Sequence, residues 1–192
     1  MAAQADAPGA ANTNGVVFWP VLVLVLLVDL VTKAVAVSAL TCCGFPYEIV
    51  GDRVRLTLVY NPGAAFGLHL GAYSRWIFLA LTAVVLRVLW HLYRRTPDRA
   101  NGRVLAIALV MAGALGNAVD RLRSSQGVID FLDVGVGAWR WPTFNVADVA
   151  VTTGAALLAW TLWGEEDEAP AHAASAPLVP APDGADASRP AS

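Results

Sequence analysis

The sequence predicts an all-α membrane protein with four transmembrane helices and a small β-rich outer link between the first two. Three observations carry this prediction. The 192 residues are 57% hydrophobic and only 15% charged, whereas a soluble domain has about 25% charged residues. Four stretches are apolar over about the 20 residues that a bilayer-spanning helix needs. Arginines gather in one short link, which is typical of a cytoplasmic loop.

Composition excludes several other classes of protein. The formal net charge is −2, and nucleic-acid binding domains carry a basic patch for phosphates, so we expect no nucleic-acid partner. High hydrophobicity excludes a wholly disordered chain. Cys42 and Cys43 are adjacent and form no CxxC pair, and we expect them to be small apolar side chains.

The chain divides into a membrane domain and two tails. We predict a four-helix membrane domain over residues 16–163. Residues 1–15 and the Ala/Pro-rich residues 164–192 lack apolar periodicity. Such segments bury too little apolar surface to fold, so both tails are predicted to be disordered.

The orientation of the predicted spans follows from the arginines. The link after the second span holds Arg94, Arg95, Arg99 and Arg103, and the positive-inside rule places it in the cytoplasm. Both termini then lie in the cytoplasm, and the links 41–73 and 120–145 face outward. The four spans are residues 16–40, 74–93, 103–119 and 146–163.

The first outer link has the pattern of a strand. Val54, Leu56 and Leu58 alternate with more polar residues, which is typical of a half-buried strand. The sequence NPG at residues 61–63 indicates a turn. We therefore expect a short hairpin or small sheet that lies on the membrane surface.

Two charged residues interrupt the first span. Asp29 and Lys33 are four residues apart, so they share a helix face and are able to pair. A charge near the centre of a membrane helix costs about 2.5–3.5 kcal/mol on insertion scales. The pair is either structural or takes a direct part in function, and the sequence leaves both roles open.

Acidic and amide side chains gather at the predicted outer ends of the spans. Two Asn–Asp pairs have a spacing of three, which places each pair on one helix face. Unpaired polar groups are costly near a bilayer, so this convergence predicts a site. The set comprises Asn61, Asn117, Asp120, Asp130, Asp133, Asn145 and Asp148.

The chemistry of these residues favours acid–base catalysis by paired carboxylates. The sequence has no HExxH or GxSxG motif. Two aspartates held close together share a proton, which is the arrangement of aspartic proteases. The residues alone do not choose the pair among Asp120, Asp130, Asp133 and Asp148. A small polytopic protein for cation-coupled or proton-coupled binding or transport remains the alternative, with Asp29 in the proton path.

Five segments identify a resemblance over about Val16 to Trp163. Taken in order, they resemble the bacterial lipoprotein signal peptidases, the type II signal peptidase family. The segments are DLVTK from Asp29, NPGAAF from Asn61, GALGNAVDR from Gly113, VIDF from Val128, and FNVAD from Phe144.

The resemblance implies a membrane aspartic endopeptidase that removes the signal peptide from diacylglyceryl-modified prolipoproteins. It implies cleavage on the N-terminal side of the lipidated cysteine, no cofactor or metal, and sensitivity to globomycin-type cyclic peptides. The protein is expected to be a monomer in the bacterial cytoplasmic (inner) membrane, with its active site at the outer face. The substrate's acyl chains are expected in lipid against the helices.

The resemblance also assigns roles to individual residues. Asp130 and Asp148 are the catalytic pair, and Asn145 orients this pair or binds substrate. Asp133 matches no motif and is expected on the surface or in a loop. The remaining residues are supporting or substrate-binding: Asp29, Lys33, Asn61, Gly63, Asn117, Asp120 and Arg121.

Overall fold

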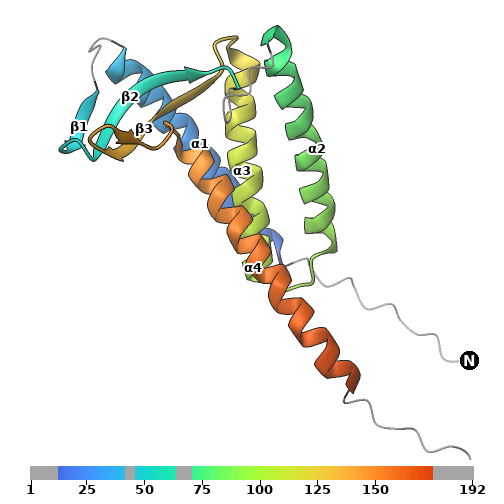
Figure 1. The fold of residues 1–192 in the computed structure, drawn as a ribbon. Coiled ribbons are helices and arrows are strands. Elements are labelled where there is room, and N and C mark those ends of the chain that lie inside the picture. The colour runs from blue at the N-terminus through green and yellow to red at the C-terminus, as the bar shows by residue number, and fades with distance from the viewer. Residues whose placement is uncertain (1–12, 42–45, 64–70, 175–192) are drawn as a thin grey trace, which may run out of the picture.

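The computed structural model describes residues 13–41, 46–63 and 71–174. In this part of the chain, four long helices form a bundle that carries a small sheet at one end (Figure 1). The helices are α1, Gly15–Leu40; α2, Ser74–Arg95; α3, Asn101–Arg123; and α4, Val146–Ala174. The strands are β1, Tyr47–Val50; β2, Val54–Asn61; β3, Val128–Val136; and β4, Trp139–Arg140. A 3-10 turn, η2, Gly71–Tyr73, directly precedes α2.

The four predicted spans are confirmed as helices. Within the described residues, four helices are long and apolar enough to cross a membrane. Helix α3 ends at Arg123, beyond the expected end at residue 119, and two arginines in its last turn favour this extension through the helix dipole. Helix α4 continues past Trp163 to Ala174. Residues 1–12, 175–192, Cys42 and Cys43 lie outside the described residues.

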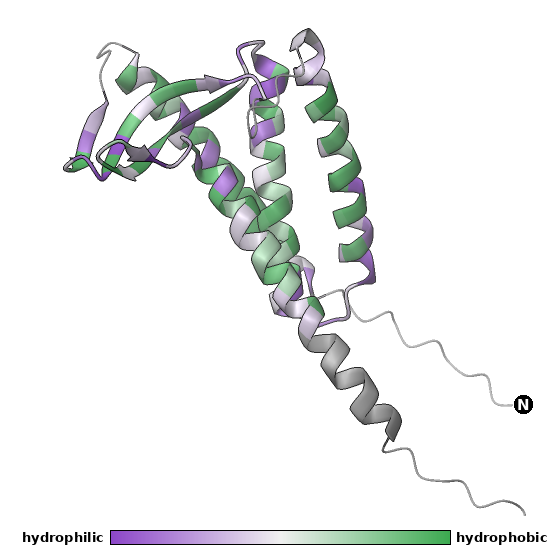
Figure 2. Ribbon diagram, viewed as in Figure 1, coloured by the Kyte–Doolittle hydropathy of each residue, from purple (hydrophilic) through white to green (hydrophobic). Residues whose placement is uncertain are grey.

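Helix α3 is the centre of the bundle. It contacts α1, α2 and α4, and most of its inward side is buried. A Cβ on Gly113 would lie 2.3 Å from the Ala147 carbonyl oxygen, so the missing side chain lets α3 and α4 approach closely. The other helices expose large apolar side chains outward, and Figure 2 shows this most plainly along α2. This surface suits a lipid environment.

Aromatic side chains join α1 and α2 at the end away from the sheet. The rings of Phe18 and Tyr93 are stacked with centroids 4.1 Å apart, and Trp90 packs beside both. Asn14 donates hydrogen bonds to the carbonyls of Thr96 and Pro97 at 3.1 Å each. These contacts fix the start of α1 against the end of α2.

The expected hairpin in the first outer link is confirmed, but the sheet is larger than predicted. Strands β1 to β4 form one antiparallel sheet in sequence order. Its second half comes from the other outer link, between α3 and α4. Strand β2 would otherwise leave a row of backbone groups unpaired, and β3 satisfies them in a register that sets Asn61 opposite Val128. The sheet therefore unites both links above one end of the bundle (Figure 1).

The expectation that Asp133 lies on the surface or in a loop is wrong. Asp133 lies on β3 and is only 6% exposed. Arg55 of β2 and Arg140 of β4 each approach its carboxylate to 2.8 Å. Burial alone would raise the pKa of Asp133, but hydrogen bonds from Arg140 and Arg55 hold it below its usual value. The buried carboxylate thus ties three strands together through two arginines.

Candidate active site

Asn145 joins two aspartates where the sheet meets helix α4. Its Nδ2 donates to Asp130 Oδ1 on β3 at 2.7 Å. Its backbone N–H donates to Asp148 Oδ2 at 3.1 Å, and Asp148 N–H donates to Asn145 Oδ1 at 2.9 Å. The last two bonds form a reciprocal cap at the start of α4, like a capping box with Asp in place of Glu or Gln. One residue thus fixes both carboxylates.

Asn117 of α3 is a second amide that organises the site. Its Nδ2 donates to Asp148 Oδ1 at 2.9 Å. Its Oδ1 accepts hydrogen bonds from Lys33 Nζ at 3.0 Å and from Asn145 Nδ2 at 3.2 Å. Both oxygens of Asp148 therefore accept hydrogen bonds, and the carboxylate has a fixed orientation.

Asn61, the last residue of β2, reaches the other carboxylate. Its Nδ2 donates to Asp130 Oδ2 at 3.1 Å, and its Oδ1 accepts from Gly63 N–H at 3.0 Å. Gly63 has φ +107°, and a Cβ there would lie 2.5 Å from side-chain atoms of Phe78 and Ser74. Only glycine fits this turn, so the NPG turn holds Asn61 in place.

A buried lysine lies beneath the two amides. Lys33 Nζ is 2.9 Å from Asp29 and 2.8 Å from Asp120, and Lys33 is only 2% exposed. Asp29 Oδ1 also accepts a hydrogen bond from Ala147 N–H at 2.8 Å, in the first turn of α4. The ion pair expected from the i,i+4 spacing is present, and it links α1 to α3 and α4.

Arg121 provides a second cation close to the carboxylates. Its guanidinium donates to the Asn117 carbonyl at 3.2 Å and lies over the Phe78 ring, 5.1 Å from its centroid. It interacts electrostatically with Asp148, Asp130 and Asp120. Two cations, Lys33 and Arg121, thus face the four aspartates Asp29, Asp120, Asp130 and Asp148.

The surroundings of Asp130 raise the pKa of its carboxyl group. Burial, followed by the nearby Asp148 carboxylate, raises the pKa of Asp130 to about 6. Hydrogen bonds from Asn61 and Asn145 act in the opposite direction, as does Lys33. A carboxyl group whose pKa is raised beside a second carboxylate is suited to act as a general acid.

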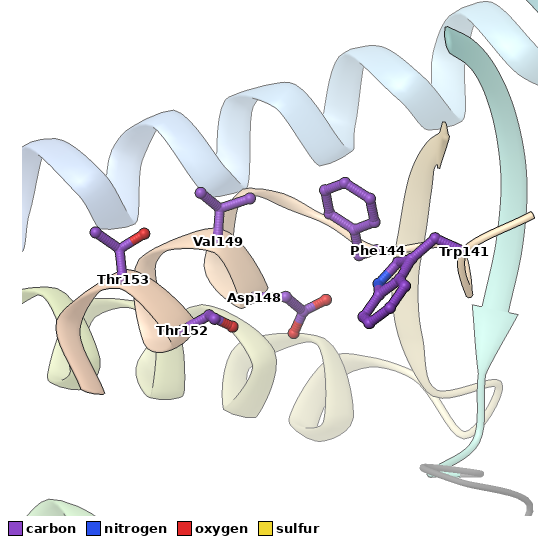
Figure 3. A pocket seen from close by; sticks show the side chains of 6 residues that line it. All are labelled: Trp141, Phe144, Asp148, Val149, Thr152 and Thr153. Carbon is purple, nitrogen blue, oxygen red and sulfur yellow. The ribbon is translucent and has the colours of Figure 1, made fainter. Parts of the chain in front are cut away.

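A pocket of about 260 Å³ lies beside Asp148. Figure 3 shows Asp148 in the middle of this pocket, with Trp141 and Phe144 on the sheet side and Val149, Thr152 and Thr153 along α4. Trp141 is 69% exposed, so the pocket opens to the surroundings of the bundle. It offers space for a ligand next to the carboxylate.

The ten residues singled out from the sequence all belong to this one network. The structure brings them together through hydrogen bonds, ion pairs and the Gly63 turn, while Asp133 lies apart from them in the sheet. Sequence reasoning missed the pocket residues Trp141 and Thr152. The i,i+4 spacing of Asp148 and Thr152 is the signal that could have identified Thr152.

The donor set favours acid–base chemistry over a bound metal. Lys33 already occupies the position between Asp29 and Asp120. Within the described ranges, no group of three or more His, Cys, Asp or Glu side chains has the arrangement of a metal site. Amide groups orient the carboxylates of Asp130 and Asp148. Among the described residues, no lysine or arginine forms a salt bridge with either carboxylate.

Comparison with known proteins gives a consistent result. Residues 21–164 match the family model described as signal peptidase (SPase) II. A lipoprotein signal peptidase of Hydrogenovibrio crunogenus is 42% identical over 142 residues, covering 73% of this chain and 80% of the relative. One from Paraburkholderia phymatum is 44% identical over 140 residues, covering 72% and 82%. One from Pelotomaculum thermopropionicum is 40% identical over 148 residues, covering 77% and 92%.

Solved structures share the fold. A bacterial membrane enzyme structure at 2.3 Å resolution is similar with a TM-score of 0.69 and 29% identity, covering 78% of this chain and 88% of the other. A second, at 1.9 Å resolution, has a TM-score of 0.65 and 30% identity, covering 74% and 90%. Both comparisons extend over most of the membrane bundle.

Proposed function

This chain belongs to the signal peptidase II family, and from that premise we propose that it is an aspartic endopeptidase acting through Asp130 and Asp148. Family membership and four membrane-length helices make it a multi-pass membrane peptidase that removes signal peptides from prolipoproteins. The proposal adds the catalytic type, the diacylglyceryl-modified substrate, and cleavage on the N-terminal side of the lipidated cysteine.

The observation that carries this proposal is that one residue, Asn145, donates hydrogen bonds to both aspartates. Asn145 binds Asp130 through its side chain and Asp148 through its backbone. The raised pKa of Asp130, about 6, supports its role as the proton-bearing member of the pair. Asp148 lies at the N-terminus of α4, where the helix dipole favours a negative charge.

The proposed reaction uses one proton shared between the two carboxylates. Asp148 removes a proton from water while the water oxygen attacks the scissile carbonyl, and Asp130 donates its proton to the carbonyl oxygen. The tetrahedral intermediate then collapses. Asp148 transfers its proton to the departing amine, and the hydroxyl returns a proton to Asp130. The pair ends in its starting protonation state, with the peptide bond hydrolysed.

The supporting residues keep this geometry fixed in the proposed mechanism. Asn117 and Asn145 orient Asp148, and Asn61 orients Asp130. Lys33 offsets the charges of Asp29 and Asp120 and holds Asn117. Pre-oriented groups of this kind lower the reorganisation needed in the transition state.

We place the site at the outer face of the bacterial cytoplasmic (inner) membrane. The link between α2 and α3 carries the clustered arginines, and it lies at the opposite end of the bundle from the sheet (Figure 1). The positive-inside rule puts that link and both termini in the cytoplasm. A single chain supplies all ten network residues, which supports a catalytic monomer.

The transport alternative has less support. The network reaches from the sheet only as far as Asp29 and Lys33. Toward the other end, the buried side of α3 is lined by apolar residues such as Val104, Ile107 and Ala108. Ionisable groups in a transport path continue across the bilayer, and the described residues provide no such continuation.

Product analysis tests the proposed cleavage site. The purified protein is incubated in detergent with a diacylglyceryl-modified prolipoprotein and with the same chain lacking the lipid, and products are measured by mass spectrometry. We expect a product that begins with the lipidated cysteine, formed only from the modified chain. Cleavage at another bond, or equal cleavage of both chains, would contradict the proposal. Asp98→Asn, an exposed acid in the α2–α3 link, is the matched active control.

A further inference from the structure

The pocket beside Asp148 contains two hydroxyl groups that the proposed mechanism does not use. Thr152 and Thr153 lie on α4 and line this pocket together with Trp141, Phe144, Asp148 and Val149. In Figure 3, Thr152 lies on the same side of α4 as Asp148, whereas Thr153 extends to the other side of the helix. The space thus continues from Asp148 along α4 past Thr152.

These hydroxyls differ from those of other helical threonines in the protein. Thr32, Thr82 and Thr161 donate to a backbone carbonyl in the preceding turn, at 2.7, 2.8 and 2.9 Å. Within residues 146–163 of α4, Thr161 makes this bond, whereas neither Thr152 nor Thr153 has a side-chain hydrogen bond in the described structure. Both residues are exposed, so their hydroxyls are available to a ligand.

The position of Thr152 matches a specific part of the proposed substrate. Thr152 follows Asp148 by four residues, so its Cα lies about 6 Å farther along the helix, away from the sheet. A diacylglyceryl group is attached through the cysteine sulfur, and its ester carbonyls lie several bonds beyond the scissile nitrogen. With the scissile bond at Asp148, the linkage is therefore long enough for an ester carbonyl to reach the level of Thr152.

The hydrogen-bonding character of the pocket also matches an ester. Its uncharged polar groups are the two threonine hydroxyls and the Trp141 indole N–H, all of which are able to donate. A glyceryl ester has acceptors but no donor.

The remaining walls suit an acyl chain. Val149 is 47% exposed and Trp141 is 69% exposed, and Phe144 closes the sheet side of the pocket. Tryptophan at a membrane interface presents an apolar face and a polar edge. An acyl chain that leaves the pocket over Val149 continues directly into lipid.

We propose that this pocket binds the glyceryl ester of the substrate, with the Thr152 hydroxyl donating a hydrogen bond to an ester carbonyl. The proposal rests on the proposed function, because it requires a lipidated cysteine at Asp148. It gives the enzyme a way to read the linkage between lipid and cysteine, in addition to the presence of apolar chains. Thr152 is then a binding residue that determines specificity.

Two matched substrates test this assignment. One prolipoprotein carries an ester-linked diacylglyceryl group, and the other carries an ether-linked dialkylglyceryl group of the same chain length, which lacks the ester carbonyls. KM and kcat are measured for wild type, Thr152→Val, Thr152→Ser and Thr161→Val. The Thr161 variant is the control, because it removes a hydroxyl from the same helix far from the pocket. Thermal unfolding verifies that each variant is folded, and Thr152→Ala replaces the valine variant if that one fails to fold.

We expect a change that depends on the ester. For the ester substrate, Thr152→Val should raise KM about fivefold, the equivalent of one hydrogen bond, with kcat nearly unchanged. For the ether substrate, the same variant should behave like wild type. Thr152→Ser should restore tight binding of the ester substrate, and Thr161→Val should match wild type with both substrates.

Other outcomes would overturn the assignment. An equal rise in KM for ester and ether substrates would show that Thr152 contacts the peptide or serves only the structure. If Thr152→Val left the KM for the ester substrate unchanged, the proposed hydrogen bond would be contradicted. Failure of folded wild-type protein to cleave either substrate would instead contradict the proposed function. The two failures are therefore distinguishable.

Discussion

Asn145 Nδ2 donates a hydrogen bond to Asp130 Oδ1 at 2.7 Å, and this bond ties strand β3 to the start of helix α4. Both residues are buried. Asn145 also caps α4 together with Asp148. The cap of this helix therefore places the Asp148 carboxylate beside that of Asp130. The position of the proposed catalytic pair is thus built into the junction of sheet and bundle.

The pH dependence of cleavage should reflect Asp130. Its pKa is raised to about 6, so the proton required for general-acid catalysis is lost as pH rises through that value. We expect kcat/KM to fall on this alkaline side, since this ratio reports the ionisations of the free enzyme. A pH profile of the purified protein measures it.

Asn61→Ala provides an internal check on the alkaline limb of this pH profile. The hydrogen bond from Asn61 favours the ionised form of Asp130, so its removal should move the alkaline limb to higher pH. A limb that stays in place, or moves to lower pH, would contradict the assignment of this ionisation to Asp130.

Lys33→Met should strongly destabilise the protein. The substitution leaves Asp29 and Asp120 buried without their cation, and breaking a buried ion pair typically costs about 3–5 kcal/mol. Thermal unfolding in detergent measures the loss. Arg87→Met is the control, because Arg87 is an exposed cation on α2. Adding Asp29→Asn to Lys33→Met should recover part of the stability. Equal stability of Lys33→Met and Arg87→Met would contradict the prediction.

Gly116→Ala should disturb the same buried cluster through steric overlap. A Cβ at Gly116 would lie 2.3 Å from Asp29 Oδ2, the oxygen that pairs with Lys33. Overpacking of this kind costs about 1–3 kcal/mol, so the unfolding temperature should fall. Gly102→Ala is the matched control on the same helix, since its Cβ would lie 3.4 Å from the nearest atom. Equal unfolding temperatures would argue against a tightly packed Asp29.

Deletion of residues 165–192 should leave cleavage unchanged. The deletion begins 17 residues after Asp148, which is about 25 Å along a helix. A longer deletion that begins at residue 157 also removes Leu158, which packs against the hydrophobic core, and should abolish stable expression. Cleavage rates of the two truncated proteins in membranes provide the comparison. A large loss of activity in the shorter deletion would assign a role to the tail.

The helices were predictable because each carries its own signal. Apolar length identified all four spans, and the arginine cluster identified their connecting loop. The sequence also indicated the polar set, because an Asp or Asn in an otherwise apolar region is costly unless it has a partner. The spacing of Asp29 and Lys33 was sufficient to predict their ion pair.

Long-range pairing was less accessible from the sequence. Strand β3 pairs with β2 across the whole of α2 and α3, and no local pattern specifies that register. Asp133 was misplaced for the same reason, because its partners Arg55 and Arg140 lie on other strands. The contact between Asn61 and Asp130 likewise depends on the register of β2 with β3.

Cleavage assays of Asp130→Asn and Asp148→Asn test the proposed catalytic pair most directly. Each purified variant is incubated with a diacylglyceryl-modified prolipoprotein beside wild type and Asp98→Asn, and thermal unfolding verifies that all four proteins are folded. Loss of a general acid or base should lower kcat by at least about 100-fold, while Asp98→Asn cleaves like wild type. Full activity in either folded variant would contradict catalysis by this pair.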